Sequence, residues 1–239
     1  MQQSNIYIII YSAILTIVCG GLLALASEGL KEKQQFNIDL EQKKNILSTV
    51  ITLKEGEDVN AVYTKRVKAY VVDFQGEVKA GMQPKDVNLA AEYKKTPDQR
   101  LLPVYEFRNE SDSTKTDYIV LPVFGYGLWN NIWGFLALQA DLNTIQGVKF
   151  QHAGETPGLG ARIETDQDVQ DRYKGKQIYE QGKLVSVKMM KGEGLDYSDN
   201  PHQVDGMSGA TLTAKGVNNM LKDYLAAYTK YMEKNKKTN

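Results

Sequence analysis

The chain of 239 residues is poor in the side chains that build metal and disulfide sites. It has one cysteine, Cys19, and two histidines, His152 and His202, which lie far apart in the sequence. A disulfide needs two cysteines and an iron–sulfur cluster needs several thiolates, so neither forms within this chain. Two histidines without paired spacing also argue against a zinc site. We therefore expect no metal centre, and any electron carried here must reside on an organic cofactor.

An excess of either charge is also missing, since 29 basic residues balance 29 acidic ones. A nucleic-acid partner is not expected, because such proteins concentrate lysine and arginine. The sequence has no phosphate-binding P-loop, no dinucleotide fingerprint and no G-x-S-x-G elbow. We do not expect a catalytic triad of Ser208, His202 and Asp205, because residues so close in sequence rarely converge on a nucleophile. We therefore predict neither a hydrolase nor an NADH site on this chain.

One long apolar run begins near the N-terminus. The stretch Ile6 to Ala26 contains no charged residue and, as a helix, spans about 30 Å. Tyr7 and Tyr11 lie near one end, where interfacial aromatics are common. The alternative is a cleaved signal peptide, but the residues before the run lack lysine and arginine, and the run is longer than usual for one. We predict a retained, single-pass transmembrane anchor over residues 1–27.

The rest of the chain mixes helical and strand patterns. Residues 28–66 are predicted to form a helical stalk or connection, with a helix over 31–50. A single soluble domain is then expected over residues 67–239. Its strand candidates, rich in apolar and β-branched residues, are 67–78, 101–108, 118–124, 133–142, 147–152 and 184–190. Because strands and helices do not alternate strictly, we predict an α+β fold with a mostly antiparallel sheet and flanking helices.

The string DGMSGATLT, residues 205–213, opens an amphipathic helix and is built like an anion cradle. Ser208 is a good N-cap, and Gly209 and Ala210 are small enough for backbone N–H groups to approach a ligand. A phosphate there would meet unpaired N–H groups and the positive end of the helix dipole. The hydroxyl of Thr211 lies where a phosphate could be attached, although a capped helix without a ligand would use the same residues. The expected core face of the helix is Val217, Leu221, Tyr224, Tyr228 and Met232.

Three segments together resemble a known family. The string 205–213 closely resembles the flavinylation motif of covalent FMN-binding domains, in which the threonine corresponding to Thr211 carries FMN through a phosphoester. GYGLW (125–129) and HAGETPGLG (152–160) resemble the other loops of the NqrC family, the covalent-FMN subunits of Na⁺-translocating NADH:quinone oxidoreductases. The similarity follows the expected order from the apolar run to the last helix, and so covers essentially the full chain.

The resemblance implies which residues contact the cofactor. Besides Asp205, Ser208, Gly209, Ala210 and Thr211 of the motif, it implies contacts from Leu128, Trp129, Glu155, Thr156 and Leu159. Taken alone, the glycines and Pro157 of these loops indicate only tight turns. A lysine near the pyrimidine end of the flavin would stabilise its reduced anion, and either Lys188 or Lys191 fits. The similarity favours Lys191.

The resemblance also implies a function. It predicts an electron-carrying subunit of a six-subunit NADH:ubiquinone reductase (Na⁺-transporting), relaying electrons through FMN between membrane, flavin and iron–sulfur subunits. A separate flavin transferase would attach the FMN, because a threonine hydroxyl needs activation and no base is evident near Thr211. The family places this domain on the periplasmic side of the bacterial inner membrane. Lys31 and Lys33 do not support that side, since the positive-inside rule would leave the domain in the cytoplasm.

Two alternatives remain. The flavin subunit of the Rnf-type ferredoxin:NAD⁺ oxidoreductase shares S-G-A-T and E-T-P-G-L-G, whereas GYGLW looks more like the sodium-pumping family. From another class, the chain could be a flavin-free membrane anchoring or assembly protein that keeps only the fold. The presence of Thr211 and Gly209 argues against that second alternative.

Overall fold

The computed structural model describes residues 4–236, so the outermost residues of the predicted anchor and of the predicted domain lie outside the described part. The described chain forms two compact units that divide between Lys43 and Lys44. The three-part division into residues 1–27, 28–66 and 67–239 stays a prediction.

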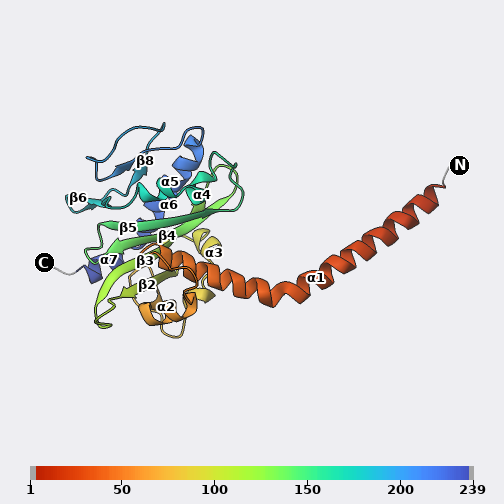
Figure 1. The fold of residues 1–239 in the computed structure, drawn as a ribbon, viewed down its shortest axis with the longest axis horizontal. Coiled ribbons are helices and arrows are strands. Elements are labelled where there is room, and N and C mark those ends of the chain that lie inside the picture. Colours follow the sequence, from red (N-terminus) through yellow and green to blue (C-terminus); the bar gives the residue numbers. More distant parts are fainter. Residues whose placement is uncertain (1–3, 237–239) are drawn as a thin grey trace. The chain divides into compact units, whose positions relative to one another are not determined.

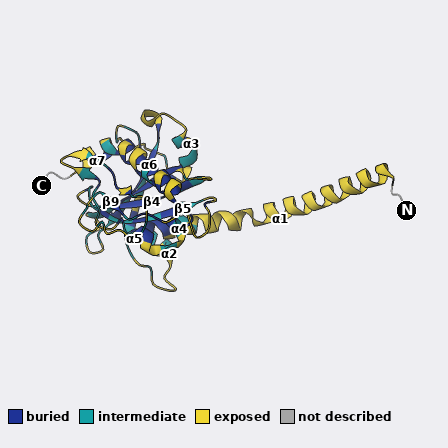
Figure 2. Cartoon of the chain, turned by 90° about the horizontal axis from the view of Figure 1, so that it is seen from above, coloured by how far each residue is buried: buried dark blue, intermediate teal, exposed yellow. Residues whose placement is uncertain are grey.

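The first unit belongs to a single helix, α1 (Asn5–Ser48), of 44 residues. We expected an anchor and a separate helix from residue 31, but no proline interrupts the chain between them, and the helix is continuous. Its apolar side chains from Ile6 to Leu25 are exposed, as the yellow ribbon in Figure 2 shows. Among the described residues, α1 is the one helix long and apolar enough to cross a membrane, judged by length and composition.

A five-stranded antiparallel sheet forms the centre of the second unit (Figure 1). Its strands follow chain order: β1 (Val67–Val72), β2 (Leu102–Arg108), β3 (Thr116–Tyr126), β4 (Asn131–Gln139) and β5 (Ile145–His152). Each strand pairs with the next in sequence, which hairpin connections allow. The mixed α+β architecture with an antiparallel sheet is therefore confirmed.

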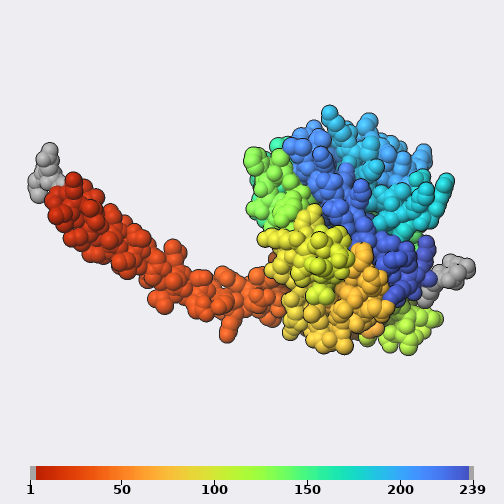
Figure 3. All heavy atoms as spheres, turned by 180° about the vertical axis from the view of Figure 1, so that it is seen from behind, coloured from red at the N-terminus to blue at the C-terminus, as the bar shows by residue number. Residues whose placement is uncertain are grey.

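One face of the sheet is covered by the C-terminal helices α6 (Thr211–Ala227) and α7 (Thr229–Asn235). All five residues predicted for the core face of this segment are buried. Gly216 of α6 has no Cβ to strike the carbonyl of Tyr126, which would lie only 2.4 Å away. The start of α6 is thereby held close to the end of β3. Figure 3 shows these helices in blue, beside the yellow segment that contains α3 (Leu89–Tyr93).

A second, smaller core fills the other face of the sheet. Alternating residues of β2 supply both cores, because successive side chains of a strand point to opposite faces: Val104 belongs to the first and Tyr105 to the second. Ile46 and Leu47, from the last turn of α1, pack here with α2 (Val59–Arg66). The end of the long helix is thus part of the folded domain.

The remaining elements are short. Residues 82–100 contain η1 (Pro84–Asp86), α3 and η2 (Pro97–Gln99), while α4 (Arg162–Thr165) and α5 (Gln167–Asp171) follow β5. The strand predicted over residues 184–190 is wrong as a single element. Its two ends belong to separate two-stranded ladders, formed by β6 (Tyr179–Glu180) with β7 (Lys183–Leu184), and by β8 (Lys188–Met189) with β9 (Gln203–Val204).

The break in that strand lies at Ser186, whose φ is 64°. A residue in this left-handed region cannot continue an extended ladder, so one strand ends before it and another begins after it. The second ladder matters for the site, because β9 leads directly into residues 205–213.

Candidate functional site

The acceptor segment, which we define as residues 205–213, ends in the first turn of α6. Thr211 is the first helical residue, and its side chain is exposed. The prediction that Ser208 caps the helix is wrong: Ala210 occupies the N-cap position and offers no side-chain cap. Gly209, with φ of 73°, turns the chain between Ser208 and the helix. The start of α6 therefore presents its threonine and its first-turn N–H groups without a capping side chain.

Glu155 is the buried centre of the site, at 4% exposure. Its Oε1 accepts the backbone N–H of Trp129 at 2.9 Å, and its Oε2 accepts the hydroxyl of Thr213 at 2.5 Å. One carboxylate thus joins three segments that are distant in sequence. These are its own loop (154–160), the Trp129 loop (127–130) and the acceptor segment. Glu155 is predicted to contact the flavin, and in the structure both of its carboxylate oxygens are bonded to groups of the protein.

The other predicted contacts of these two loops are exposed. Trp129 is 69% exposed, Leu128 46% and Leu159 41%. The indole Nε1 of Trp129 donates to the hydroxyl of Thr156 at 3.2 Å, which links the two loops at the surface. Leu159 lies against Gly209, where an added Cβ would come within 2.7 Å of its side chain. Exposed apolar side chains on neighbouring loops are typical of a ligand site.

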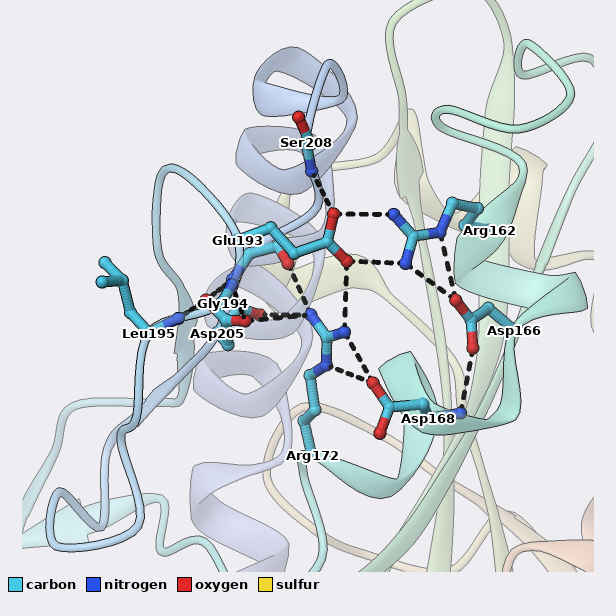
Figure 4. Close-up of polar contacts among 10 residues, drawn as sticks. Arg162, Asp166, Asp168, Arg172, Glu193, Gly194, Leu195, Asp205 and Ser208 are labelled. Carbon is cyan, nitrogen blue, oxygen red and sulfur yellow. Dashed lines mark hydrogen bonds and ion pairs between the residues drawn. The ribbon is translucent and has the colours of Figure 1, made fainter.

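A charged network holds the acceptor segment at Ser208 (Figure 4). The carboxylate of Glu193 accepts the backbone N–H of Ser208 at 2.9 Å and two hydrogen bonds from Arg162 at 2.9 and 2.6 Å. Arg172 adds a longer contact at 3.3 Å. The bonds from Arg162, and then the Ser208 N–H, lower the pKa of Glu193 to about 2. The Ser208 N–H is therefore occupied by a protein carboxylate.

Asp205 organises the loop that carries Glu193. Its carboxylate accepts the backbone N–H groups of Gly194 at 2.7 Å and Leu195 at 3.2 Å. Arg172 then donates to the carbonyl of Gly206 at 2.5 Å. Asp205 therefore folds the loop 193–195 against the acceptor segment.

Lys188 and Lys191 are both exposed, and Lys191 lies at the start of the loop that Asp205 holds.

The prediction from sequence did not include Thr213, Arg162, Glu193 or the exposed Tyr126 at the end of β3. Thr213 lies inside the matching string, so its position was available. The contact between Arg162 and Glu193 had no local signal, because 31 residues separate them.

Comparisons with known proteins identify the domain. The family model "FMN-binding domain" matches residues 127–226, which include the Trp129 loop, the Glu155 loop and the acceptor segment. The C subunit of the Na⁺-translocating NADH-quinone reductase of Pseudomonas aeruginosa is 34% identical, with 94% of this chain and 92% of that protein covered. The corresponding protein of Haemophilus ducreyi is 32% identical, over 87% of this chain and 85% of that protein.

Two crystal structures have the same fold. The C subunit of the Na⁺-translocating NADH-quinone reductase from Parabacteroides distasonis superposes with a TM-score of 0.73 at 30% identity, covering 88% of this chain and 98% of that one. NqrC from Shewanella oneidensis gives a TM-score of 0.72 at 27% identity, covering 83% and 97%.

The fold and the three convergent loops define a flavoprotein domain of the FMN-binding class, preceded by a helix suited to a membrane. The geometry fits FMN, since the exposed Thr211 opens a helix without a side-chain cap, and the exposed Leu159 lies against Gly209, two residues before it. More particularly, the chain belongs to the NqrC family, the C subunits of the Na⁺-translocating NADH-quinone reductase, an oxidoreductase complex. The predicted family is confirmed, and it favours the sodium-pumping interpretation over the Rnf-type alternative.

Proposed function

We propose that this chain carries FMN through a phosphoester on Thr211 and relays electrons between neighbouring subunits of a Na⁺-translocating NADH-quinone reductase. The observation that carries the proposal is the exposed Thr211 at the unblocked start of α6. A phosphate on its hydroxyl would lie at the positive end of the helix dipole, near the backbone of Gly209 and Ala210. FMN, when bound, supplies the redox chemistry, and the chain supplies placement and electrostatics.

The exposed side chains around Thr211 suit the ring system of the cofactor. Leu128, Trp129 and Leu159 offer apolar surface, and Thr156 is positioned by the indole N–H of Trp129. A site this open leaves an edge of the ring accessible, as exchange of electrons with partner proteins requires. An open site also retains a ligand poorly, so a covalent bond keeps the cofactor in place. Lys191 would favour the reduced anion if it approaches the ring.

Attachment of FMN requires a separate flavin transferase. A threonine hydroxyl is a weak nucleophile without a base. The two carboxylates that hold the acceptor segment are already engaged, Glu155 by Thr213 and Glu193 by Arg162. In the assembled six-subunit complex, residues 1–27 would anchor the chain in the inner membrane. Residues 28–66 would connect this anchor to the domain of residues 67–239, which would hold FMN on the periplasmic side.

The test is the intact mass and peptide map of the full chain purified from its native host. We expect an FMN-sized increment on the peptide that contains Thr211. Thr211→Val should abolish in-gel flavin fluorescence after denaturation without unfolding the domain, whereas Thr64→Val, at an exposed threonine of α2, should retain it. An unmodified Thr211 in protein assembled with its partners would contradict the proposal and favour a flavin-free anchoring role.

A further inference from the structure

We propose that Glu155 is a positioning residue, whose buried carboxylate fixes the helix carrying Thr211 against the loop carrying Trp129. The inference rests on the proposed function, because it concerns how the two ends of a bound FMN are held in register. Thr211 would hold the phosphate end, and the Trp129 loop would adjoin the ring. Glu155 is bonded to both segments.

Both carboxylate oxygens of Glu155 accept a hydrogen bond, one from an amide N–H and one from a hydroxyl. Among the ion pairs of the described residues, none includes Glu155. Its negative charge is therefore held by neutral donors, unlike that of Glu193. Such a charge is costly to bury and needs both hydrogen bonds.

Two glycines of the neighbouring loops leave the room that this carboxylate occupies. A Cβ on Gly127 would lie 2.4 Å from Oε1 of Glu155, and a Cβ on Gly160 would lie 2.6 Å from Oε2. The other glycines of the Glu155 loop are different: a Cβ on Gly154 would meet nothing closer than 3.7 Å, and one on Gly158 would meet nothing within 4 Å. Glu155 thus explains the lack of a side chain at 127, and Glu155 together with the Thr213 hydroxyl, 2.4 Å from the added Cβ, explains the lack of one at 160.

The two bonded partners act on the flavin site through short, stiff connections. Thr213 is two residues after Thr211 in the first turn of α6, so fixing one fixes the other. The Trp129 amide belongs to the residue whose indole N–H bonds Thr156. Sites of this kind lose function when supporting contacts loosen by about 1 Å. A nearby uncompensated negative charge would also disfavour a reduced anionic flavin, and so lower its potential.

The test compares Glu155→Gln, Thr213→Val and the double variant in the full chain. Glu92→Gln is the control for removing a buried carboxylate elsewhere in the domain, because Glu92 is also buried and accepts a backbone N–H, from Leu101 at 2.9 Å, although it differs from Glu155 in pairing with Lys95. At a fixed potential, we expect Glu155→Gln to raise the ratio of reduced to oxidised FMN about 3- to 10-fold and to alter visible circular dichroism. Thr213→Val should alter the same flavin dichroism, and the double variant should not add to it, because the two side chains form one contact.

A second readout needs no flavin. In the Thr211→Val background, we expect Glu155→Ala, which removes the acceptor of the Trp129 N–H, to speed hydrogen exchange at the Trp129 amide at least about tenfold, and Glu92→Ala to leave it unchanged. If Glu155→Gln does not fold, Thr213→Val carries the test alone. The positioning role is overturned if folded variants keep wild-type dichroism, potential and Trp129 exchange. Wild-type protein without FMN would instead refute the proposed function, and the exchange measurement would still decide the role of Glu155.

Discussion

Glu155 and Glu193 hold the acceptor segment at two different residues, Thr213 and Ser208, and they do so by different physical means. Glu155 is 4% exposed, bonds a helical hydroxyl and an amide, and has no cationic partner among the described ion pairs. The Glu193 side chain is 25% exposed and is shared by Arg162 and Arg172. A buried contact to neutral donors is insensitive to salt but intolerant of added volume, whereas a partly exposed ion pair is screened. The contacts of Glu155 therefore fix how α6 packs against the Trp129 loop, whereas the ion pairs of Glu193 restrain the loop 193–195.

The largest expected effect comes from adding volume beside Glu155. Gly160→Ala would place a Cβ 2.4 Å from the Thr213 hydroxyl. We expect the free energy of unfolding to fall by about 1–3 kcal/mol, as in overpacked cores. Urea unfolding of the detergent-solubilised full chain measures it. Gly154→Ala is the control, since its Cβ would meet nothing closer than 3.7 Å. Equal losses in the two variants would contradict the distinction between a shaped junction and an ordinary loop.

A smaller effect is expected on the charged side. Arg162→Leu leaves Glu193 with only Arg172 and the Ser208 N–H. Because the pair is partly exposed, we expect a loss of about 1 kcal/mol in the free energy of unfolding at low salt. The loss should shrink as salt rises toward about 1 M, where screening is nearly complete. Glu155→Gln should show no such trend, and a shared salt dependence would remove the contrast between the two carboxylates.

The smallest effect is the pH dependence of stability. Arg162 and the Ser208 N–H lower the pKa of Glu193 from 4.5 to about 2. A lowered pKa stabilises the fold above the unfolded-state value, and that contribution is lost as pH falls from about 4.5 toward 2. Glu193→Gln should therefore flatten the fall in stability in this window. Glu110→Gln, at an exposed carboxylate, is the control. An unchanged slope in Glu193→Gln would contradict the assignment.

The main elements of the sheet were predictable because they are signalled locally. The hairpin of β4 and β5 turns at Asp141, whose carboxylate accepts the N–H groups of Asn143 and Thr144. Such turns depend on a few neighbouring residues. The core face of α6 followed likewise from helical spacing alone, since Val217 and Leu221 are fully buried. Local chemistry and local periodicity were enough for these features.

The errors arose where distant residues decide the local structure. Ser208 has the side chain of an N-cap, but its backbone is held by Glu193, 15 residues away, and Gly209 turns the chain before the helix begins. The apolar run 184–190 has strand composition, yet Ser186 adopts a left-handed φ between two separate ladders. In the site, the matching strings predict Thr211 and Trp129, whereas the link from Glu155 to Thr213 spans 58 residues and had no sequence signal.

The space at Gly127 and Gly160 has a consequence for how the family can vary. Each glycine leaves room for one carboxylate oxygen of Glu155, so we expect substitutions at these three positions to depend on one another. A relative that replaced Glu155 with a smaller residue would lose the constraint at 127 and at the face of 160 that meets the carboxylate. Alanine at 127 should therefore become tolerable once Glu155 is replaced, so the glutamate should be lost first along a lineage, whereas alanine at 160 would still meet the Thr213 hydroxyl at 2.4 Å.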